Sequence, residues 1–353
     1  MQFRSYLDNA AVFTVPQALD SQRQLSSPQL QDRFQRSFSY LRLSLTDKCN
    51  FRCQYCLPNG YIARPGEPAV LTRAEITRLV RGFSALGLRK VRLTGGEPSL
   101  RKDLTDIIAD ISTTSDVQKV VLSTNGYRLA RDVKQWQAAG LSAVNVSIDS
   151  LEPARFASLT GSDNLALVLR GIDQALDAGL SQVKINTVLL AQTDATEILR
   201  FFDYVRLHPV TVRFIELMET GGTTAYFDQQ RQSADRLLSY LHHHGWQAQP
   251  RNADSGPAIE FIHPDYLGRI GVIAPYSKGF CDSCNRLRVT AQGQLLTCLF
   301  ATDSQPLRPL LQSDDQQNAL QQHLQKLIRH KSATHQLQSR EAGLNHGFSA
   351  MGG

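Results

Sequence analysis

Long apolar runs are missing from this chain of 353 residues. No stretch approaches the ~18 consecutive apolar residues that a membrane-spanning helix needs, and the N-terminal residues lack the apolar core of a secretory signal peptide. Cysteine is scarce as well, with six residues in the whole chain, whereas disulfide-stapled proteins are mostly short and secreted. The sequence therefore argues against a membrane protein and against a disulfide framework, and it predicts a cytoplasmic protein whose thiols stay reduced.

A strong excess of charge of one sign is also missing. Lys and Arg number 38 against 32 Asp and Glu, and 20% of the residues are charged against 42% hydrophobic. This composition is that of an ordinary globular protein and excludes a disordered, collagen-like or coiled-coil chain. The modest net charge of +6 favours an anionic small molecule as ligand. Nucleic-acid binding would call for basic clusters with interleaved aromatic residues, which the sequence lacks.

The order of the predicted elements indicates an α/β fold. Helical patterns occur at 164–179 and after Thr72, which forms a capping-box pattern with Glu75. They alternate with six runs of strand character, YLRLSLT (40–46), KVRLT (90–94), KVVLST (119–124), AVNVSID (143–149), VKINTVLL (183–190) and TVRFIEL (211–217). Strands that alternate with helices build a parallel sheet, and a closed barrel of this type has more units. The pattern predicts an open, partial (β/α)6 TIM-like barrel at 38–222.

The N-terminal residues before this barrel have a different composition. Residues 1–37 contain seven Gln and five Ser with little periodicity. Such a segment cannot bury enough apolar surface to fold alone, and we predict a poorly ordered extension to which we assign no chemistry.

Residues 223–353 are predicted to form a C-terminal module. A helical stretch that ends in three histidines (242–244) is followed by short strands at 259–262 and 269–274 and by a hairpin with its turn at Gln292-Gly293. Three consecutive residues on a helix cannot all face one ion. We therefore interpret the histidines as a solvated helix end.

The six cysteines fall into two groups of three, and the first group follows the first predicted strand. Cys49, Cys53 and Cys56 form a CxxxCxxC motif. A structural zinc ion needs one ligand more, and no other Cys or His lies nearby to supply it. Three thiolates that hold an iron–sulfur cluster leave one iron without a protein ligand, and an open position is what a catalytic metal centre requires. The first triad therefore favours a catalytic cluster over a zinc site or unrelated thiols.

This motif resembles that of the radical S-adenosylmethionine (SAM) superfamily, whose members bind a 4Fe-4S cluster through CxxxCxxC on a partial barrel. The segment TGGEP (94–98) resembles the superfamily's motif for the SAM amino group, in which paired glycines let backbone carbonyls approach the ligand and Glu97 can balance an ammonium. The resemblance implies that SAM chelates the open iron and that an electron from the cluster cleaves it to a 5′-deoxyadenosyl radical. Tyr55 falls on the superfamily's aromatic position near the adenine.

The second triad consists of Cys281, Cys284 and Cys298, a CxxC pair followed by the predicted hairpin and the third cysteine. Its spacing suits either a cluster or a zinc ion with a borrowed ligand such as His263. The surrounding FCDSCNRLRVTAQGQLLTCLF resembles the C-terminal signature of the GTP 3′,8-cyclase family, which begins molybdenum cofactor biosynthesis. LRLSLTDKCNFRCQYCLP, KVRLTGGEPSLRKDL, NVSIDSL, VKINTV and RFIELM follow in that family's order. The resemblance implies a C-terminal auxiliary-cluster module, whose second 4Fe-4S cluster binds the guanine of GTP through its open iron.

The same resemblance implies the residues of the site. GTP-contacting positions fall on Arg42, Arg92, Ser123, Lys184, Arg286, Leu287 and Arg288, and SAM-contacting positions on Tyr55, Gly96, Ser147 and Met218. Arg286 and Arg288 are also implied to act in catalysis by holding and polarising the substrate. Guanidinium groups suit this role because they bind phosphate oxygens through paired hydrogen bonds. Taken singly, each arginine is also compatible with a solvated charge and each serine with a strand-end cap.

The C-terminal dipeptide Gly352-Gly353 matches the family's Gly-Gly tail, which is implied to reach into the active site beside the substrate. The chain departs from the family pattern at Met351, where Ile is common, and at Glu219, where Pro is frequent. These departures lie at the tail and in the loop after the sixth strand. Ubiquitin-like carriers also end in two glycines, but they are small and lack six βα units.

The implied activity is that of a lyase that converts GTP to (8S)-3′,8-cyclo-7,8-dihydroguanosine 5′-triphosphate. The 5′-deoxyadenosyl radical abstracts the hydrogen from C3′, and the C3′ radical attacks C8 of guanine. Implied partners are cyclic pyranopterin monophosphate synthase, an electron donor and a second copy of the chain. One alternative is a peptide-modifying radical SAM enzyme, which would need neither the RLR segment at 286–288 nor the Gly-Gly tail. Another is a nucleic-acid-binding protein with a metal cluster, which would bind RNA in a strongly salt-dependent way.

Overall fold

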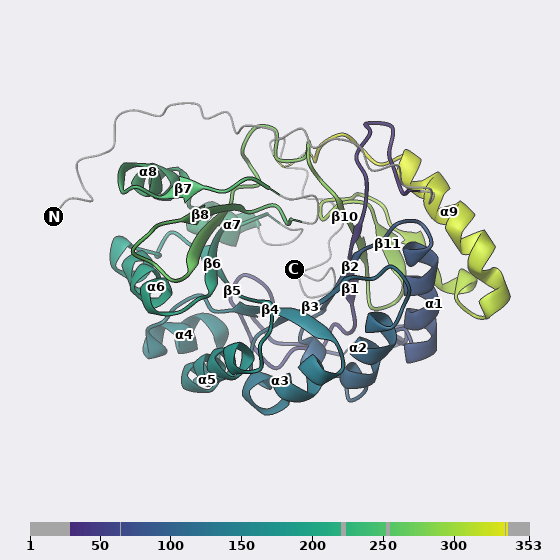
Figure 1. Cartoon of the computed structure of the whole chain (residues 1–353), viewed down its shortest axis with the longest axis horizontal. Coiled ribbons are helices and arrows are strands. Elements are labelled where there is room, and N and C mark those ends of the chain that lie inside the picture. The colour runs from purple at the N-terminus through teal and green to yellow at the C-terminus, as the bar shows by residue number, and fades with distance from the viewer. Residues whose placement is uncertain (1–28, 64, 220–223, 252–254, 336, 338–353) are drawn as a thin grey trace.

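A sheet of twelve strands forms the centre of the computed structural model, which describes residues 29–63, 65–219, 224–251, 255–335 and 337. The strand order is β12-β11-β10-β1-β2-β3-β4-β5-β6-β9-β8-β7. The six central strands are parallel to their neighbours and are β1 (Tyr40–Ser44), β2 (Lys90–Thr94), β3 (Lys119–Thr124), β4 (Leu141–Ser147), β5 (Gln182–Leu189) and β6 (Thr211–Glu216). They curve around a centre without closing into a ring (Figure 1), which confirms the predicted partial barrel.

Helices cover the outer face of these strands (Figure 1). They are α1 (Arg73–Ser84), α2 (Leu104–Ser112), α3 (Leu129–Ala138), α4 (Pro153–Thr160), α5 (Leu165–Asp177) and α6 (Ala195–Leu207). The predicted capping box is present, because the Thr72 hydroxyl accepts from the Glu75 N–H and the Glu75 carboxylate accepts from the Thr72 N–H. The strands and the two named helices were thus predicted to within a few residues. In the described part of the chain, none of the helices is both long enough and apolar enough to span a membrane.

The alternation of side chains along each strand separates the core from the barrel interior. Leu41 and Leu43 of β1 are buried in the hydrophobic core between sheet and helices. Tyr40 and Arg42, which alternate with them, line the cavity inside the barrel. Because successive strand residues point to opposite faces, the six strands supply an apolar outer layer and a polar interior.

The chain after residue 222 adds strands to both edges of the barrel sheet. On one edge, β10 (Arg286–Val289) runs parallel to β1, and β11 (Gln294–Leu296) and β12 (Gln305–Pro306) follow in antiparallel order. On the other edge, β9 (Arg269–Ile273) runs parallel to β6, with β8 (Ile259–Ile262) and β7 (Gln247–Ala248) beyond it. The described part of this region also contains the α-helices α7 (Thr224–Gln230), α8 (Asp235–His243) and α9 (Gln317–Arg329). The predicted C-terminal module therefore shares one sheet with the barrel, and its boundary at 223 stays a prediction.

Two local predictions in this region are confirmed. β10 and β11 form the predicted hairpin, and Gly293 in its turn has a φ of +83°, a conformation that favours glycine. The rings of His243 and His244 at the end of α8 donate to the backbone carbonyls of Ser239 and Tyr240. These two histidines are exposed and bind their own helix, as expected for a solvated helix end.

Residues 29–37, which the sequence assigned to the poorly ordered extension, are folded against the barrel. Leu30 is buried in the main hydrophobic core, as is Phe38, the residue that comes directly after this segment. The Leu30 N–H donates to the Leu86 carbonyl at 3.1 Å. The difference from the prediction arises because these apolar residues are widely spaced and give no periodic pattern. Residues 1–28 lie outside the described part of the chain.

Candidate active site

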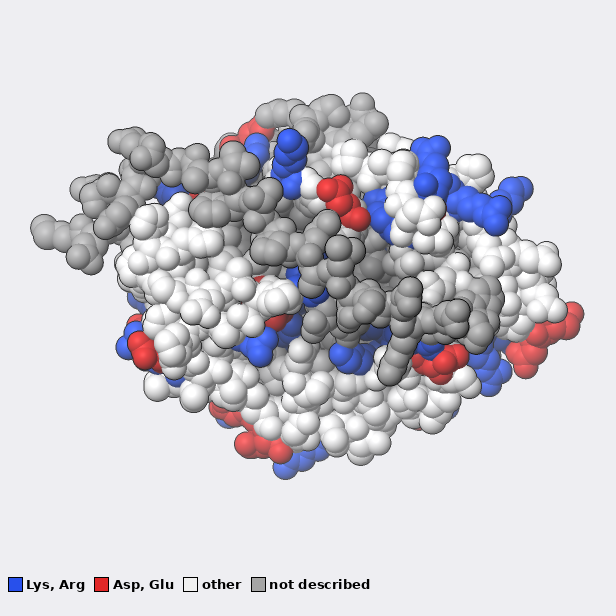
Figure 2. Space-filling model, turned by 45° about the horizontal axis from the view of Figure 1, so that its top comes forward, with Lys and Arg blue, Asp and Glu red and all other residues white. Residues whose placement is uncertain are grey.

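A cavity inside the barrel brings together most of the predicted site residues. All six cysteines line it, together with Arg42, Arg92, Ser123, Arg286 and Arg288 and with Tyr55, Gly96, Ser147 and Met218. In Figure 2, Lys and Arg side chains are visible near the centre of the face that is drawn. The two triads are far apart in sequence, so their presence around one cavity is a result of the fold.

The first triad lies in the loop that follows β1, and backbone hydrogen bonds fix this loop to its surroundings. The Arg52 and Gln54 N–H groups donate to the carbonyls of Thr160 and Leu159 at the end of α4. The Cys49 sulfur accepts from the Phe51 N–H at 3.5 Å. This loop geometry presents all three cysteines to the cavity.

The chemistry of the first-triad thiols fits a cationic group. Burial is the main cause that raises the pKa of Cys49 to about 11, and the neighbouring Glu97 carboxylate adds to it. Burial, followed by the Asp149 carboxylate, also raises the pKa of Cys53 well above its usual value. Thiolates in such surroundings need positive charge beside them, which an iron–sulfur core supplies.

Glycines at the end of β2 allow the backbone to lie directly on the cysteine loop. A Cβ atom on Gly96 would lie 2.4 Å from the Lys48 carbonyl oxygen, and one on Gly95 would lie 2.4 Å from that of Thr46. Gly95 also has a φ of +151°, which side chains rarely adopt. The Gly96 N–H donates to Thr46 O at 2.7 Å. The paired glycines are therefore required for the contact between β2 and the loop, besides leaving Gly96 open to the cavity.

Glu97, which the sequence suggested as a partner for the SAM ammonium, is engaged elsewhere. Its side chain is fully buried, and it does not appear among the described residues that line the cavity. One carboxylate oxygen accepts from the Ser99 N–H and the Thr124 hydroxyl, at 2.9 and 2.8 Å, and the other accepts from the Asn125 N–H at 2.7 Å. The carboxylate thus joins the ends of β2 and β3.

Tyr55 is fixed by a buried carboxylate that the sequence analysis missed. Its hydroxyl donates to Asp149 Oδ2 at 2.8 Å, and Asp149 Oδ1 accepts from the Val188 N–H at 2.9 Å. Burial raises the pKa of Asp149 to about 6. Asp149 follows the quoted Ser147 by two positions, and only the fold shows that it faces Tyr55.

The second triad is assembled from two segments of the C-terminal region. Cys281 and Cys284 precede β10, and Cys298 follows β11. His335 lines the cavity beside them, and its Nε2 donates to the Pro275 carbonyl at 2.9 Å. Burial would raise the pKa of Cys281, but hydrogen bonds with His335 and Thr334 lower it to about 7. No sequence pattern pointed to His335, a lone histidine far along the chain.

The zinc alternative for the second triad finds little support in the geometry. His263, the suggested borrowed ligand, packs against Trp246 and Tyr266 and does not line the cavity within the described chain. The described residues also contain no group of three or more His, Cys, Asp or Glu side chains arranged to hold a single metal ion. Cluster ligands bind different irons, so a cluster does not require that arrangement.

Buried and half-buried arginines line the cavity. Arg42 of β1 stands in register with Arg92 of β2 on one side and Arg288 of β10 on the other. Arg213 of β6, which the sequence analysis did not single out, is 4% exposed and donates to Asn145 Oδ1 at 2.6 Å. Burial, then repulsion from Arg286, lowers the pKa of Arg288 to about 10, and burial with repulsion from Arg92 lowers that of Arg213 to about 9. Like charges buried together are unfavourable without an anion, so the cavity suits a ligand with several negative charges.

Comparisons with known proteins agree with these features. A model of the radical SAM superfamily matches residues 43–205, and a model of Molybdenum Cofactor Synthesis C matches residues 210–337. A GTP 3′,8-cyclase of Stenotrophomonas maltophilia (strain K279a) is 50% identical over 325 residues, covering 92% of this chain and 99% of that protein. The chain belongs to the GTP 3′,8-cyclase family. Relatives of the same name from Yersinia pestis and Vibrio cholerae serotype O1 (strain M66-2) are 49% and 48% identical over 326 residues, 92% of this chain and 99% and 98% of theirs.

Solved structures agree on the architecture. Streptococcus suis SuiB bound to S-adenosylmethionine has a TM-score of 0.59 at 14% identity and covers 83% of this chain and 68% of its own. The anSMEcpe enzyme with bound AdoMet has a TM-score of 0.53 at 14% identity, covering 82% and 83%. At this identity the likeness shows the fold alone, which is the radical SAM fold.

Several residues implied by the GTP 3′,8-cyclase family do not line the cavity or lie outside the described chain. Lys184 Nζ pairs with Glu260 Oε1 at 2.5 Å, and Leu287 is buried in the core. Neither is among the described lining residues, so a Leu287 contact would have to come from its backbone. Glu219 is buried and its N–H donates to the Tyr276 hydroxyl at 3.2 Å. Gly352-Gly353 and Met351 lie outside the described residues.

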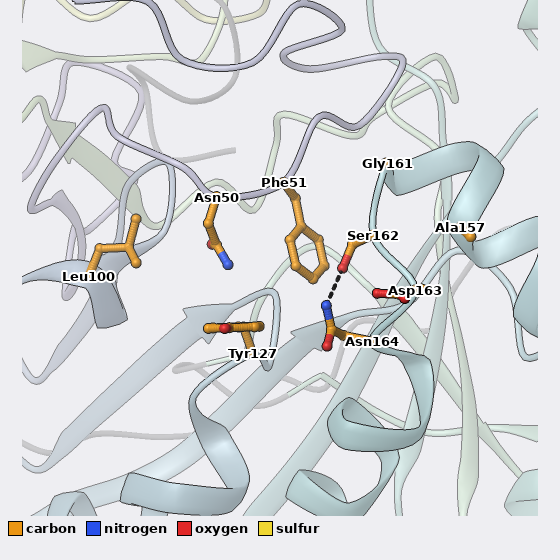
Figure 3. A pocket seen from close by; sticks show the side chains of 9 residues that line it. All are labelled: Asn50, Phe51, Leu100, Tyr127, Ala157, Gly161, Ser162, Asp163 and Asn164. Atoms are coloured by element: carbon orange, nitrogen blue, oxygen red, sulfur yellow. Dashed lines mark hydrogen bonds between the residues drawn. The ribbon is translucent and has the colours of Figure 1, made fainter.

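Residues of the first cysteine loop also line a second pocket (Figure 3). Asn50 and Phe51 of the loop line it, with Tyr127 after β3 and residues 162–164 after α4. Phe51 lines the central cavity as well. Asn50 Oδ1 accepts from the Asn125 amide at 2.8 Å, which ties the loop to the end of β3. The cysteine loop therefore lines both the central cavity of this GTP 3′,8-cyclase family member and this second pocket, which we call the outer pocket.

Proposed function

We propose that this chain converts GTP to (8S)-3′,8-cyclo-7,8-dihydroguanosine 5′-triphosphate, the reaction for which its family is named, at the start of molybdenum cofactor biosynthesis. The observation that carries the proposal is the single cavity shared by two cysteine triads and a group of buried arginines. A radical enzyme must hold its cofactor and substrate close together, and one cavity that serves both meets that need.

Each triad is proposed to hold a 4Fe-4S cluster. The radical SAM fold supports the first cluster, and the second rests on the thiol donor set and its place beside the cavity. When bound, the first cluster together with SAM supplies the 5′-deoxyadenosyl radical. Tyr55, Gly96, Ser147 and Met218 are proposed to bind SAM, with the Tyr55 ring held in place by Asp149. The Gly96 backbone is available for this because the residue has no side chain to close the cavity.

The arginines of the cavity are proposed to bind the triphosphate. Arg42, Arg92, Arg286 and Arg288 line the cavity with Ser123, and the structure adds Arg213 to the family set. The Nε atoms of Arg92 and Arg213 are buried and, within the described chain, have no hydrogen-bond partner. Phosphate oxygens would satisfy such donors and neutralise the repulsion among the guanidinium groups. Contacts from Lys184, the Leu287 backbone and Gly352-Gly353 remain part of the proposal.

The partners and the location of the enzyme are proposals as well. The product is proposed to pass to cyclic pyranopterin monophosphate synthase, and an electron donor must reduce the first cluster. The outer pocket supports access for such a donor, because the first cysteine loop forms its wall. A homodimer and the cytoplasm are further expectations, the latter because the six cysteines are free thiols in the described structure.

The test is anaerobic reconstitution followed by incubation with SAM, dithionite and GTP. We expect 5′-deoxyadenosine and the cyclised nucleotide to form together. Changing Arg288 to Ala removes a buried charged hydrogen-bond donor, which should lower kcat/KM for GTP by about tenfold to a hundredfold while SAM cleavage without GTP turnover persists. Arg131→Ala is the matched control, since Arg131 is exposed and pairs only with Asp132 among the described residues. A cluster-loaded wild-type protein that neither cleaves SAM nor consumes GTP would refute the proposed function.

A further inference from the structure

The N-terminal segment before the barrel contains a buried ion pair. Asp32 and Arg36 face each other across a tight turn, with 2.7 Å between Arg36 Nη2 and Asp32 Oδ2, and the Arg36 and Asp32 side chains are 7% and 0% exposed. The turn places Gln35 at a φ of +64° and is closed by the Arg36 N–H, which donates to Asp32 Oδ1 at 3.0 Å. Burying an ion pair costs desolvation, so its presence in a short surface segment calls for further contacts.

Those contacts reach two distant segments of the C-terminal region. Arg36 Nη1 donates to the carbonyl of Cys281 at 3.1 Å and to that of Ala333 at 2.6 Å. Arg36 Nη2 donates to the Ser332 carbonyl at 2.6 Å, and Nε donates to Asp32 at 2.7 Å. All three nitrogens of the guanidinium group therefore donate hydrogen bonds, and one side chain joins the turn, the second cysteine loop and the segment at 332–333.

A second buried cation, Lys331, also binds a backbone carbonyl beside the triad. Lys331 Nζ donates to the carbonyl of Thr297, the residue before Cys298, and lies over the Phe38 ring at 5.6 Å. Phe38 follows the turn directly and belongs to the main core. Two cations that contact the N-terminal segment thus bind backbone carbonyls at or beside two of the three cysteines.

We propose that the turn at residues 32–36 positions the second cysteine triad, with Arg36 as the positioning residue. This positioning role rests on the proposed function, in which the second triad holds a cluster. Arg36 fixes Cys281 relative to the segment at 332–333, from which His335 contacts the same cysteine. A cluster with three protein ligands depends on the order of the loop that carries them, and outer contacts of this kind typically set how tightly a metal is held.

The experiment isolates the second triad by changing Cys49, Cys53 and Cys56 to Ala. After anaerobic reconstitution this background should hold about four irons per chain, and its reduced EPR signal should change when GTP is added. Arg36→Lys keeps the charge but cannot hold carbonyls on two segments at once. In the background, this variant should lose iron to a chelator at least about tenfold faster and lose the GTP-induced EPR change. With all six cysteines present, it should keep the first cluster and form 5′-deoxyadenosine from SAM.

Arg33→Lys is the matched control, because Arg33 lies in the same turn with an exposed side chain stacked on Phe34. The proposal is overturned if Arg36→Lys and Arg36→Met hold iron as tightly as this control and keep the EPR change. It is also overturned if Arg36→Lys loses both clusters from the full chain, which would mean a general folding role. If the background binds no iron with Arg36 intact, the second cluster itself is wrong, and that outcome separates failure of the proposed function from failure of the turn.

Discussion

Lys184 lies inside the barrel at the third position of β5. Burial, followed by repulsion from Arg213, lowers the pKa of its ammonium group to about 8 although Glu260 opposes the shift. A triphosphate would raise that pKa, so GTP binding favours the protonated amine. Below about pH 8 the lysine is already charged, and above it the affinity for GTP should fall by up to about tenfold per pH unit. A guanidinium group keeps its proton to a higher pH than an ammonium group in the same surroundings, so Lys184→Arg should flatten the profile between about pH 7 and 9 in equilibrium dialysis of GTP without SAM.

Tyr40 provides the control for this pH profile. Burial raises the pKa of its hydroxyl, but Arg92 and Arg42 bring it down to about 8, so its ionisation would weaken binding in the same range. The Lys184 contribution should therefore be measured in a Tyr40→Phe background. Equal pH profiles for Tyr40→Phe with and without Lys184→Arg would show that Lys184 does not meet the nucleotide.

A substitution of Glu97 tests whether its carboxylate has a structural or a ligand-binding role. Its two carboxylate oxygens accept hydrogen bonds from Ser99, Thr124 and Asn125. In a glutamine, an NH2 group replaces one of these oxygens and cannot accept from the donor that it faces. Glu97→Gln should therefore lower the free energy of unfolding of the cluster-free protein by about 1–3 kcal/mol in urea titrations. Glu67→Gln, at an exposed site, is the control. A carboxylate that served only the SAM ammonium would leave the stability of the cluster-free protein unchanged.

At the scale of elements, the six parallel strands were predictable because each is a short run of apolar and β-branched residues that ends in turn residues. Helix α9 was missed although Leu320, Leu324 and Ile328 are buried at helical spacing. Its remaining positions are mostly polar, and so narrow an apolar stripe stands out less than that of α5. The turn at 32–36 could not be predicted, since its order depends on carbonyls contributed by residues 281, 332 and 333.

The candidate site shows the same division. The cysteine spacing and strand-end glycines are local patterns, and they predicted both triads and Gly96, which the fold places around one cavity. Arg213, Asp149 and His335 carry no local signal, because their roles arise from neighbours on other strands or loops. Glu97 shows the converse: its residue type suggested a ligand contact, whereas its partners on β3 show a structural one. Sequence patterns therefore predict which segments matter better than they predict what each side chain contacts.

At the scale of the whole molecule, the C-terminal region completes the barrel rather than standing beside it. β10 and β9 extend the parallel sheet at its two edges and bury Leu287, Val289, Ile270 and Val272 in the same core as the central strands. The cavity likewise takes its walls from both regions, with Tyr55 and Met218 from one and the second triad from the other. Neither region presents a complete site or a complete sheet alone, so we expect both to unfold together.

The two tryptophans of the chain allow this to be measured, since Trp136 lies in α3 of the barrel and Trp246 follows α8 in the C-terminal region. Both are buried, so each should change its fluorescence on unfolding. In cluster-free Trp136→Phe and Trp246→Phe proteins, the urea midpoint from the remaining tryptophan should equal the midpoint from far-ultraviolet circular dichroism within the error of the fit. Comparing the two probes inside each variant removes any effect of the substitution on overall stability. If the Trp246 midpoint differed from that of circular dichroism, the region after residue 222 would be an independently folding module, and the shared sheet would not make the two regions one cooperative unit.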